Sequence, residues 1–389
     1  MEIDIEAAAL LTRAEALVPT LRTNAVAAEK ARWISEDTLE ALAAAGVFRM
    51  TAPRRYGGQQ ASFETQCQVL AAIARGCPST SWVATIYSAM TWLAAVFPDE
   101  AQEEIFADRD PRMSGVFSPT GVAAEQAGGY VVKGRWPFNT GGRGSRWTGL
   151  VAIAPTPDGS GMPLFAIARS RELTTLDDWD ATGMSATGSN TVVADDVFVP
   201  AHRVLRLPDL MEAIHPHRHN HADPYFRHPL APVLAVNAGG TPIGIARGVY
   251  ENFMNRLPNR GIAYTTYTSK KDAPITHLEV GEAALRIESA EAHVHTACAL
   301  LDRHRDVPMS KEERVKARVH IAYATGLARK AVDSLFFASG ASVIQTGIPL
   351  QRFQRDMQAL ANHAIMHSPT AIELYGRVLC GLEPNTPIY

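Results

Sequence analysis

The spacing of hydrophobic residues changes twice along this 389-residue chain. Near the start, apolar side chains recur every three or four positions, which is typical of amphipathic helices. They then come in short runs rich in valine, isoleucine, phenylalanine and leucine, separated by turn residues, as in β-strands. Beyond a histidine- and proline-rich stretch the helical spacing returns. The pattern predicts a helical domain at 1–112, a β domain at 113–207, a linker at 208–232 and a helical bundle at 233–389.

Individual segments add detail to these predictions. Strand-length runs lie at 150–154, 163–170 and 191–200. Because no helix-length segment separates them, we expect an antiparallel sheet. Amphipathic helices are expected at 243–257, 275–304, 310–339 and 350–382. Long helices with short connections form a bundle, and their remaining apolar stripes predict an oligomer.

The first domain carries clear helix signals. Ser35 is followed by acidic residues, as at a helix N-terminus, and Gly46 ends that helix. Another helix is expected at 62–75. The uncharged segment 76–98 is nearly long enough to span a bilayer, but prolines bracket it and serines and threonines interrupt it. We therefore expect a buried core helix.

Charge and cysteine content narrow the function classes. The 37 Lys and Arg residues nearly balance 40 Asp and Glu residues, with no long run of one sign. Nucleic-acid binding needs a basic stripe, so we expect none. The acidic N-terminus lacks the basic region of a signal peptide, which predicts a cytoplasmic protein without a membrane partner. The cysteines form no CxxC pair, which fits a reducing compartment. They are Cys67, Cys77, Cys298 and Cys380.

Histidine is frequent, and five of the 13 histidines lie between His215 and His228. Alternating histidines can ligate Zn, Ni or Cu. This run lies in a proline-rich linker, however, so a solvated loop is the favoured interpretation and a mobile lid the alternative. We predict no metal site.

Common enzyme signatures are missing from the sequence. It contains no GxGxxG after a strand, no GxxxxGK[ST], no GxSxG and no HExxH. The glycine-rich segment 141–144 follows a strand but opens no helix. It is interpreted as a hairpin turn, with a phosphate-binding loop as the alternative.

Several segments together resemble the acyl-CoA dehydrogenase superfamily. The run GYVVKGRWPFNTGG at 129–142 is similar to the strands that hold the flavin ring there. DDVFVP at 195–200 is similar to the strand that ends its β domain, and LQRFQRD at 350–356 to the start of a late helix. The resemblance covers nearly the whole chain. It implies a mostly α fold with an N-terminal helical domain, a middle antiparallel β-barrel domain and a C-terminal four-helix bundle.

One departure from the dehydrogenases points to a branch. They carry a catalytic Glu in a Tyr-Glu-Gly-Thr segment after "RD", whereas this chain has MQALANHAIMHSPT at 357–370, with His363 eight residues beyond Arg355. That pattern resembles the group D two-component flavin-dependent monooxygenases, such as the 4-hydroxyphenylacetate and steroid-ring phenol hydroxylases. The segments at 44–50, 53–58 and 77–82 also look like that branch.

The resemblance implies an activity. FADH2 or FMNH2 arrives from a separate flavin reductase and reacts with O2 to give a C4a-hydroperoxyflavin. A phenol, indole or polycyclic aromatic substrate then attacks the distal oxygen. The missing nicotinamide-binding signature fits a reductase on another polypeptide. The expected assembly is a homotetramer.

The resemblance also assigns site residues. His363 is expected to act as a base or as a hydrogen-bond partner of the hydroperoxide, helped by Thr140 and Ser118. The substrate is expected to contact Trp82, His363 and His367, the last two one turn apart on the same helix face. The expected flavin contacts are Phe117, Ser118, Trp136, Phe138, Thr140 and Gly141, with Arg260, Gly340 and Ser342 reaching a flavin in a neighbouring subunit.

Three alternatives stay open. The same scaffold supports N-oxygenation of an amine or amino sugar. A true acyl-CoA dehydrogenase would need a relocated carboxylate, for which Glu251, Glu279 and Glu282 are the candidates. A flavin-free oligomeric binding protein is the third possibility.

Overall fold

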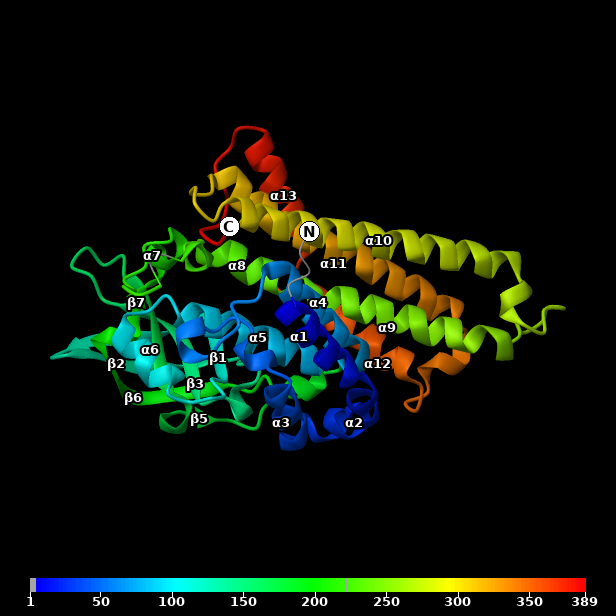
Figure 1. Ribbon diagram of the computed structural model, residues 1–389, viewed down its shortest axis with the longest axis horizontal. Helices are drawn as coiled ribbons and strands as arrows, with labels where there is room; N and C mark the ends of the chain where they lie inside the picture. The colour runs from blue at the N-terminus through cyan, green and yellow to red at the C-terminus, as the bar shows by residue number, and fades with distance from the viewer. Residues whose placement is uncertain (1–4, 221–222) are drawn as a thin grey trace.

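The computed structural model describes residues 5–220 and 223–389. Figure 1 shows an elongated molecule with a sheet at one end and long helices extending away from it. The N-terminal helices are α1 (Ile5–Ala16), α2 (Val18–Ala31), α3 (Glu36–Ala44), α4 (Phe63–Gly76), α5 (Pro78–Ala94) and α6 (Asp99–Phe106). The strands are β1 (Met113–Gln126), β2 (Gly129–Trp136), β3 (Trp147–Ala154), β4 (Met162–Arg169), β5 (Thr174–Thr175), β6 (Val192–Pro200) and β7 (Val204–Arg206). The later helices are α7 (Leu207–Met211), α8 (Leu230–Asn237), α9 (Gly240–Arg256), α10 (Pro274–Arg303), α11 (Lys311–Ala338), α12 (Pro349–Ala361) and α13 (Ser368–Leu379).

The uncharged helix α5 lies in the middle of the core. It contacts α4, β1, α8 and α9, and the rings of Tyr87 and Trp92 on it are fully buried. The expectation of a buried core helix is confirmed. Among the helices at residues 5–220 and 223–389, none combines the length and apolar character that a membrane span requires.

Side-chain caps start two of the N-terminal helices where the sequence predicts them. The Ser35 hydroxyl accepts a hydrogen bond from the backbone N–H of Thr38 at 3.3 Å. The Ser62 hydroxyl accepts one from the backbone N–H of Thr65 at 3.2 Å. Each cap satisfies one of the unpaired N–H groups of a helix N-terminus.

The seven strands form one sheet in the order β5-β6-β2-β1-β3-β4-β7. Five of its six pairings in the described residues are antiparallel, but β1 and β3 run parallel. The connection 137–146 carries the chain from β2 across to the other side of β1, so β3 runs opposite to β2 and parallel to β1. The expected antiparallel barrel is therefore corrected to a mixed sheet with β5 and β7 at its edges.

Helices α9 to α12 pack together as the bundle. Helix α11 contacts α9, α10, α12 and α13, and its buried face is built mainly from small and β-branched residues. A capping box at Ser310 and Glu313 starts α11. Small side chains allow the long helices to approach closely over their whole length.

The helix expected at 350–382 is in fact two helices. Helix α12 ends at Ala361, and α13 begins at Ser368. Pro369 lies in the first turn of α13. A proline inside a continuous helix would remove a backbone hydrogen bond and clash with the preceding turn, so the helix has to restart there.

The histidine-rich segment is partly buried and partly solvated, because Pro216, Arg218 and His219 are exposed whereas His217 and His228 are buried. His228 is 1% exposed and stacks edge-on against Phe63, with ring centroids 5.6 Å apart. His217 is also buried, and Asn220 donates hydrogen bonds to the Ala95 carbonyl and the Gln102 side chain. The expectation of a solvated loop is therefore wrong for His217 and His228, and Phe63 of α4 covers the second of them. His221 lies outside the described residues.

Candidate functional site

The connection between β2 and β3 holds the segment expected to meet the flavin. Phe138 has a φ of 63° and is 69% exposed. A positive φ is uncommon for an aromatic residue and here turns the ring out of the sheet. The ring meets Trp179 edge-on, with centroids 6.0 Å apart. Two aromatic side chains therefore offer apolar surface beside this connection.

Hydrogen bonds to the rest of the protein hold Asn139 and Gly141 in place. The Asn139 backbone N–H donates to the Asn190 carbonyl at 3.2 Å. The Tyr87 hydroxyl donates to the Gly141 carbonyl at 2.5 Å. Gly141 has a φ of 75°, and a Cβ there would come within 2.7 Å of the Tyr87 ring. The 141–144 segment is thus part of a tight crossover connection that is fixed to α5, and not the expected hairpin turn, because β2 and β3 do not pair but flank β1 in the sheet.

Thr140 belongs to a row of buried hydroxyls. Its Oγ1 lies 2.7 Å from Ser189 Oγ, which lies 2.7 Å from Thr187 Oγ1. Thr187 donates to the Met184 carbonyl at 2.8 Å. Thr140 is 7% exposed, and Ser189 and Thr187 are also buried. The only hydroxyl of this row that the sequence singles out is therefore supported by two hydroxyls from the 183–191 segment.

Trp136 does not reach this surface. The residue is fully buried in the sheet core, and its indole N–H donates to the Val151 carbonyl at 2.7 Å. The expectation that Trp136 walls the flavin ring is wrong, because no part of the side chain is accessible. Trp136 instead supports the connection between β2 and β3 from within the sheet core.

Phe117 and Ser118 lie where β1 leaves its ladder with β3. The register shifts between Val116 and Gly121, which makes a bulge that re-aims side chains. Phe117 packs on Phe165, with ring centroids 5.1 Å apart, while Ser118 is exposed. Ser118 is therefore accessible to a ligand, whereas Phe117 is only partly accessible.

His363 lies in the turn between α12 and α13. Its ring packs edge-on against Trp82, with centroids 5.2 Å apart and the planes at 70°. Trp82 is in the first turns of α5 and is almost completely buried. The contact brings two residues 281 positions apart into one place. The expected substrate contacts Trp82 and His363 are therefore together.

The charge state of His363 follows from its surroundings. The ring is accessible, yet burial, with a smaller contribution from Arg318, lowers the pKa of His363 to about 4. One side of His363 is exposed, and protein atoms lie close to the rest of the ring. The backbone N–H of Ile365 donates to Nδ1 at 3.4 Å, so the neutral ring carries its proton on Nε2.

His367 is separated from His363 by the helix break. It lies at the N-cap position of α13, and its Nδ1 is 3.2 Å from Thr370 Oγ1. The expectation of one shared helix face is wrong, because residues 362–367 are not helical. His367 belongs to the start of α13.

A buried carboxylate joins α12 to the hydroxyl row. Asp356 Oδ1 accepts a hydrogen bond from the Met184 backbone N–H at 2.5 Å. Burial raises the pKa of Asp356 to about 7, against lowering by Arg352 and Arg355. Arg355 also donates to the Thr182 carbonyl and, at 2.5 Å, to Glu29. The bundle is thus fixed to the segment that carries Thr187 and Ser189.

Arg260, Gly340 and Ser342 lie close together at the far end of the bundle. Arg256 donates to Ser342 at 3.4 Å, and Lys270 donates to the Ala338 carbonyl next to the Gly340 turn. Figure 1 places the connection between α9 and α10, which contains Arg260 and Lys270, at the end of the molecule opposite the sheet. In one chain, these residues are therefore remote from the connection of Thr140.

This end of the bundle is electropositive. A small cavity there is lined by Phe253, Arg256, Leu257, Arg260, Lys270 and Ser339. Burial and the neighbouring Arg260 lower the pKa of Arg256. Burial also lowers the pKa of Lys270, with Glu279 opposing that effect and Arg256 adding to it. Three cations held near one another favour an anion.

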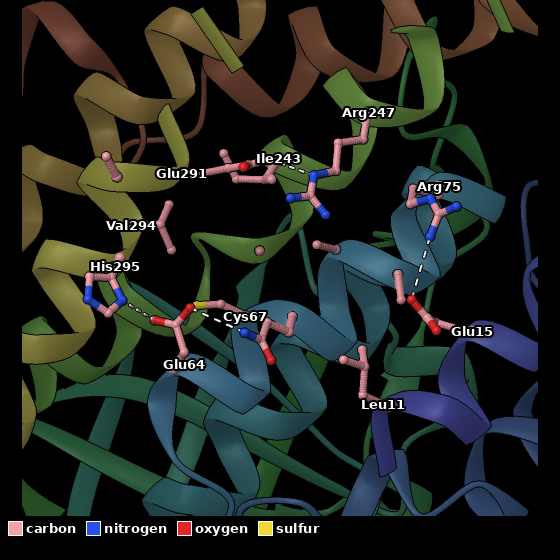
Figure 2. Close-up of a pocket in the computed structure, with 15 residues that line it drawn as sticks. Leu11, Glu15, Glu64, Cys67, Arg75, Ile243, Arg247, Glu291, Val294 and His295 are labelled. Carbon is pink, nitrogen blue, oxygen red and sulfur yellow. Dashed lines mark hydrogen bonds and ion pairs between the residues drawn. The ribbon is translucent and has the colours of Figure 1, made fainter. Parts of the chain in front are cut away.

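A separate cavity of about 520 Å³ lies between α1, α4, α9 and α10 (Figure 2). Its charged side chains pair with one another: Arg247 with Glu291 at 2.5 Å, and His295 with Glu64 at 3.1 Å. None of the expected site residues is among the described residues that line it.

Sequence reasoning missed several residues of this arrangement. Ser189, Thr187 and Asp356 are buried polar residues. Ser189 contacts Thr140 across 49 positions and Asp356 contacts Met184 across 172, and Thr187 joins the site through Ser189. Trp179 had a visible signal, because a lone tryptophan in a loop between strands is often a contact residue. Arg256 and Lys270 flank Arg260 in the sequence and were not recognised as a cluster.

Comparisons with known proteins agree with this architecture. The family model for the acyl-CoA dehydrogenase N-terminal domain matches residues 8–109. The family model for the acyl-CoA dehydrogenase C-terminal domain matches residues 237–368. The matched C-terminal range includes both His363 and Asp356.

Individual relatives are similar over nearly their full length. The chain is 34% identical to the flavin-dependent monooxygenase oxygenase subunit HsaA of Rhodococcus jostii strain RHA1, covering 96% of this chain and 98% of that one. It is 29% identical to the oxygenase component of FADH2-dependent resorcinol hydroxylase of Rhizobium sp. strain MTP-10005, covering 97% and 95%. The structure of XiaF from Streptomyces sp. in complex with FADH2 and glycerol has a TM-score of 0.91 at 31% identity, covering 99% and 98%. The chain therefore belongs to the acyl-CoA dehydrogenase superfamily, in the branch of the oxygenase components of flavin-dependent monooxygenases.

Proposed function

We propose that this protein uses reduced flavin, supplied by a separate reductase, and O2 to hydroxylate a small aromatic compound. The observation that carries the proposal is the neutral imidazole of His363, packed on Trp82. A dehydrogenase would need a carboxylate base for its substrate. Related proteins named for reduced flavin and for phenolic substrates support the choice of cofactor and substrate class.

The residues present fit a flavin. An isoalloxazine needs flat apolar surface and polar partners at its edge, and Phe138, Trp179 and Thr140 offer both. When bound, a reduced flavin supplies the electrons that activate O2.

Each group of this chain has a distinct task in the proposal. Phe138 and Gly141 would contact the ring system, with Phe117 at its margin, and Thr140 and Ser118 would hydrogen-bond its polar edge. His363 would donate its Nε2 hydrogen to an oxygen atom at the reacting centre. Trp82 fixes the imidazole plane and offers apolar surface to an aromatic substrate, with His367 farther from the centre.

The positive end of the bundle suits the phosphate groups of a flavin. Because Arg260, Gly340 and Ser342 lie far from Thr140 in one chain, they would serve a flavin held mainly by another copy. This proposal requires an oligomer, for which we propose a homotetramer. The three cations favour FAD over FMN, because FAD carries two phosphate groups and FMN carries one. A cytoplasmic location fits the need for a reductase partner.

None of the three glutamates considered for the dehydrogenase alternative suits the role of its base. Glu251 accepts hydrogen bonds from Arg22 and Arg75, each at 2.6 Å. Glu282 is paired with Arg286, and Glu279 lies on α10 near Lys270. All three carboxylates lie on α9 or α10 and interact with arginine or lysine side chains.

The test is a reduced-flavin assay with purified protein and a panel of phenols, indoles and amines. We expect a product heavier by one oxygen atom from a phenol or indole, formed only with O2 and reduced flavin. An oxygenated amine instead would establish N-oxygenation. Reduction of bound oxidised flavin by an acyl-CoA without air would establish dehydrogenation and reject the proposal.

A further inference from the structure

Arg318 is a buried cation on α11 without an acidic partner. The residue is 8% exposed, and burial lowers the pKa of its guanidinium. No carboxylate among residues 5–220 and 223–389 lies within ion-pair distance of it. A buried charge without a countercharge costs free energy of folding. Fold stability therefore does not explain its presence.

Two backbone carbonyls hold the guanidinium of Arg318. Its Nη2 donates to the Ala364 carbonyl at 3.1 Å, and its Nη1 donates to the Ile388 carbonyl. Ala364 directly follows His363 in the turn between α12 and α13, and Ile388 lies in the C-terminal segment 383–389. A planar guanidinium holds two acceptors in fixed directions. Arg318 therefore ties both segments to one point of α11.

The helix and the C-terminal segment are themselves anchored. Helix α11 contacts α13, and Val319 and Ala371 belong to one buried apolar cluster there. Figure 1 shows the chain turning back after α13. The Glu383 carbonyl accepts two hydrogen bonds from Arg377, each at 3.2 Å, and the Glu383 carboxylate pairs with Lys311 at 2.8 Å. The guanidinium thus joins the turn of His363 to two fixed parts of the bundle.

We infer that Arg318 positions His363 for the reaction, by tying the turn 362–367 to α11 and to the C-terminal segment. The inference rests on the proposed function, in which His363 acts at the reacting centre. Trp82 of α5 sets the angle of the imidazole plane, whereas Arg318 sets the path of the backbone that carries the ring. Arg318 is a positioning residue, because it acts on the reaction through His363.

The charge of Arg318 gives this role a measurable signature. It acts on the His363 ring and adds to the effect of burial, which together lower the pKa of His363 to about 4. Trp82, which faces the ring from α5, is uncharged, and His367 is turned toward Thr370 at 3.2 Å. A neutral side chain in place of the guanidinium should raise the pKa of His363, although burial keeps it below its ordinary value of 6.5.

The test compares Arg318→Met and Arg318→Lys with the wild type in the reduced-flavin assay. Methionine removes both the tether and the charge. We expect kcat to fall by about 10- to 100-fold, the scale of a misplaced catalytic group, and the acidic limb of kcat/KM to move up from near pH 4. Lysine keeps the charge but lacks the planar fork. We expect it to lower kcat as well, with the acidic limb where the wild type has it.

Arg314→Met is the matched control, one turn earlier on α11. Arg314 donates to the Met211 carbonyl at 3.2 Å and pairs with Glu212 at 2.9 Å, in place of the turn of His363. This variant should keep the wild-type kcat and acidic limb. Denaturant unfolding checks that each variant is folded. Arg318→Met should unfold close to the wild-type midpoint, because it removes a buried charge that lacks a countercharge.

The outcomes separate the two proposals. If the wild type forms no oxygenated product from reduced flavin and O2, the proposed function fails. If it does, and both Arg318 variants turn over within about twofold of the wild type, the function stands and the positioning by Arg318 is wrong. A lower kcat in Arg318→Met with an unmoved acidic limb would also reject the inference, because a general packing defect would have that effect. If Arg318→Met does not fold, the kcat of Arg318→Lys decides.

Discussion

The imidazole of His363 stands edge-on against the indole of Trp82, with ring centroids 5.2 Å apart. One ring belongs to the turn between α12 and α13, and the other to the start of α5. Aromatic pairs in this arrangement hold each other at a defined angle. A residue of the core helix α5 therefore fixes the orientation of the imidazole.

Replacing His363 by alanine should remove this group without disturbing the fold. The side chain is accessible and its turn is held by Arg318, which donates to the Ala364 carbonyl at 3.1 Å. We expect product formation to fall by about 100-fold or more, the usual scale for a lost acid, base or donor. Flavin affinity should stay the same. The measurement is coupled turnover together with a flavin titration.

The matched control for this variant is His367→Ala, four residues away at the start of α13. We expect turnover within about threefold of the wild type, because the helix break takes His367 away from His363. Equal turnover of His363→Ala and the wild type would remove His363 from the mechanism.

The low pKa of His363 has a kinetic consequence. Burial and Arg318 lower it to about 4, so the ring stays neutral at every pH above about 5. The acidic limb of kcat/KM from His363 should therefore lie near pH 4 rather than near 6.5, the ordinary value. A pH profile of substrate turnover at saturating reduced flavin measures it. An acidic limb at 6.5 that disappears in His363→Gln would contradict this prediction.

The cationic end of the bundle should contribute to flavin binding from another subunit. We expect Arg256→Ala and Arg260→Ala each to weaken binding of reduced FAD by about 10- to 100-fold, as for a lost hydrogen bond between charged groups. Arg305→Ala is the control, because Arg305 is exposed, lies just beyond α10 and forms an ion pair with Asp302.

Subunit mixing tests whether the two halves of the site come from different copies. A protein with Arg260→Ala and a protein with Thr140→Val each carry one damaged half. Co-expressed subunits should recover part of the wild-type flavin binding, since some pairs combine both intact halves. Mixed assemblies that bind no better than the two parents would place Arg260 outside the flavin site.

The sequence predicted the succession of elements well, because long periodic segments report burial directly. Its errors have local causes. Counting four residues from His363 to His367 assumed one helix, although Pro369 already signalled a restart. The resemblance placed both Trp136 and Phe138 at the flavin ring, but the strand ends at Trp136 and the positive φ of Phe138 turns its ring away from the sheet.

Other features were beyond the reach of local patterns. The parallel pairing of β1 with β3 depends on which side of β1 the connection 137–146 reaches. The burial of His228 depends on Phe63, which is 165 positions away. Ser189 became part of the site only through its contact with Thr140. Polar residues with distant partners carry no periodic signal, so tertiary contacts alone identify them.

Asp356 should make stability depend on pH in a way that is unusual for a carboxylate. Burial raises its pKa to about 7, above its ordinary value of 3.8. Between these values the folded protein holds a proton that the unfolded chain has released. The contribution of Asp356 to the free energy of unfolding therefore falls by about 1.4 kcal/mol per pH unit as pH rises from about 4 to about 7. Above that range the contribution is constant.

Asp356→Asn tests this slope, because the amide keeps an oxygen that can accept from the Met184 N–H and has no titration. We expect the free energy of unfolding of Asp356→Asn to increase relative to that of the wild type as pH rises from 5 to 7. This difference should level off above pH 7. Denaturant unfolding at several pH values measures it. Glu282→Gln, at an exposed pair with Arg286, should show a nearly flat difference over the same range. A flat difference for Asp356→Asn as well would mean that Asp356 is already ionised at pH 5, which its burial beside Met184 argues against.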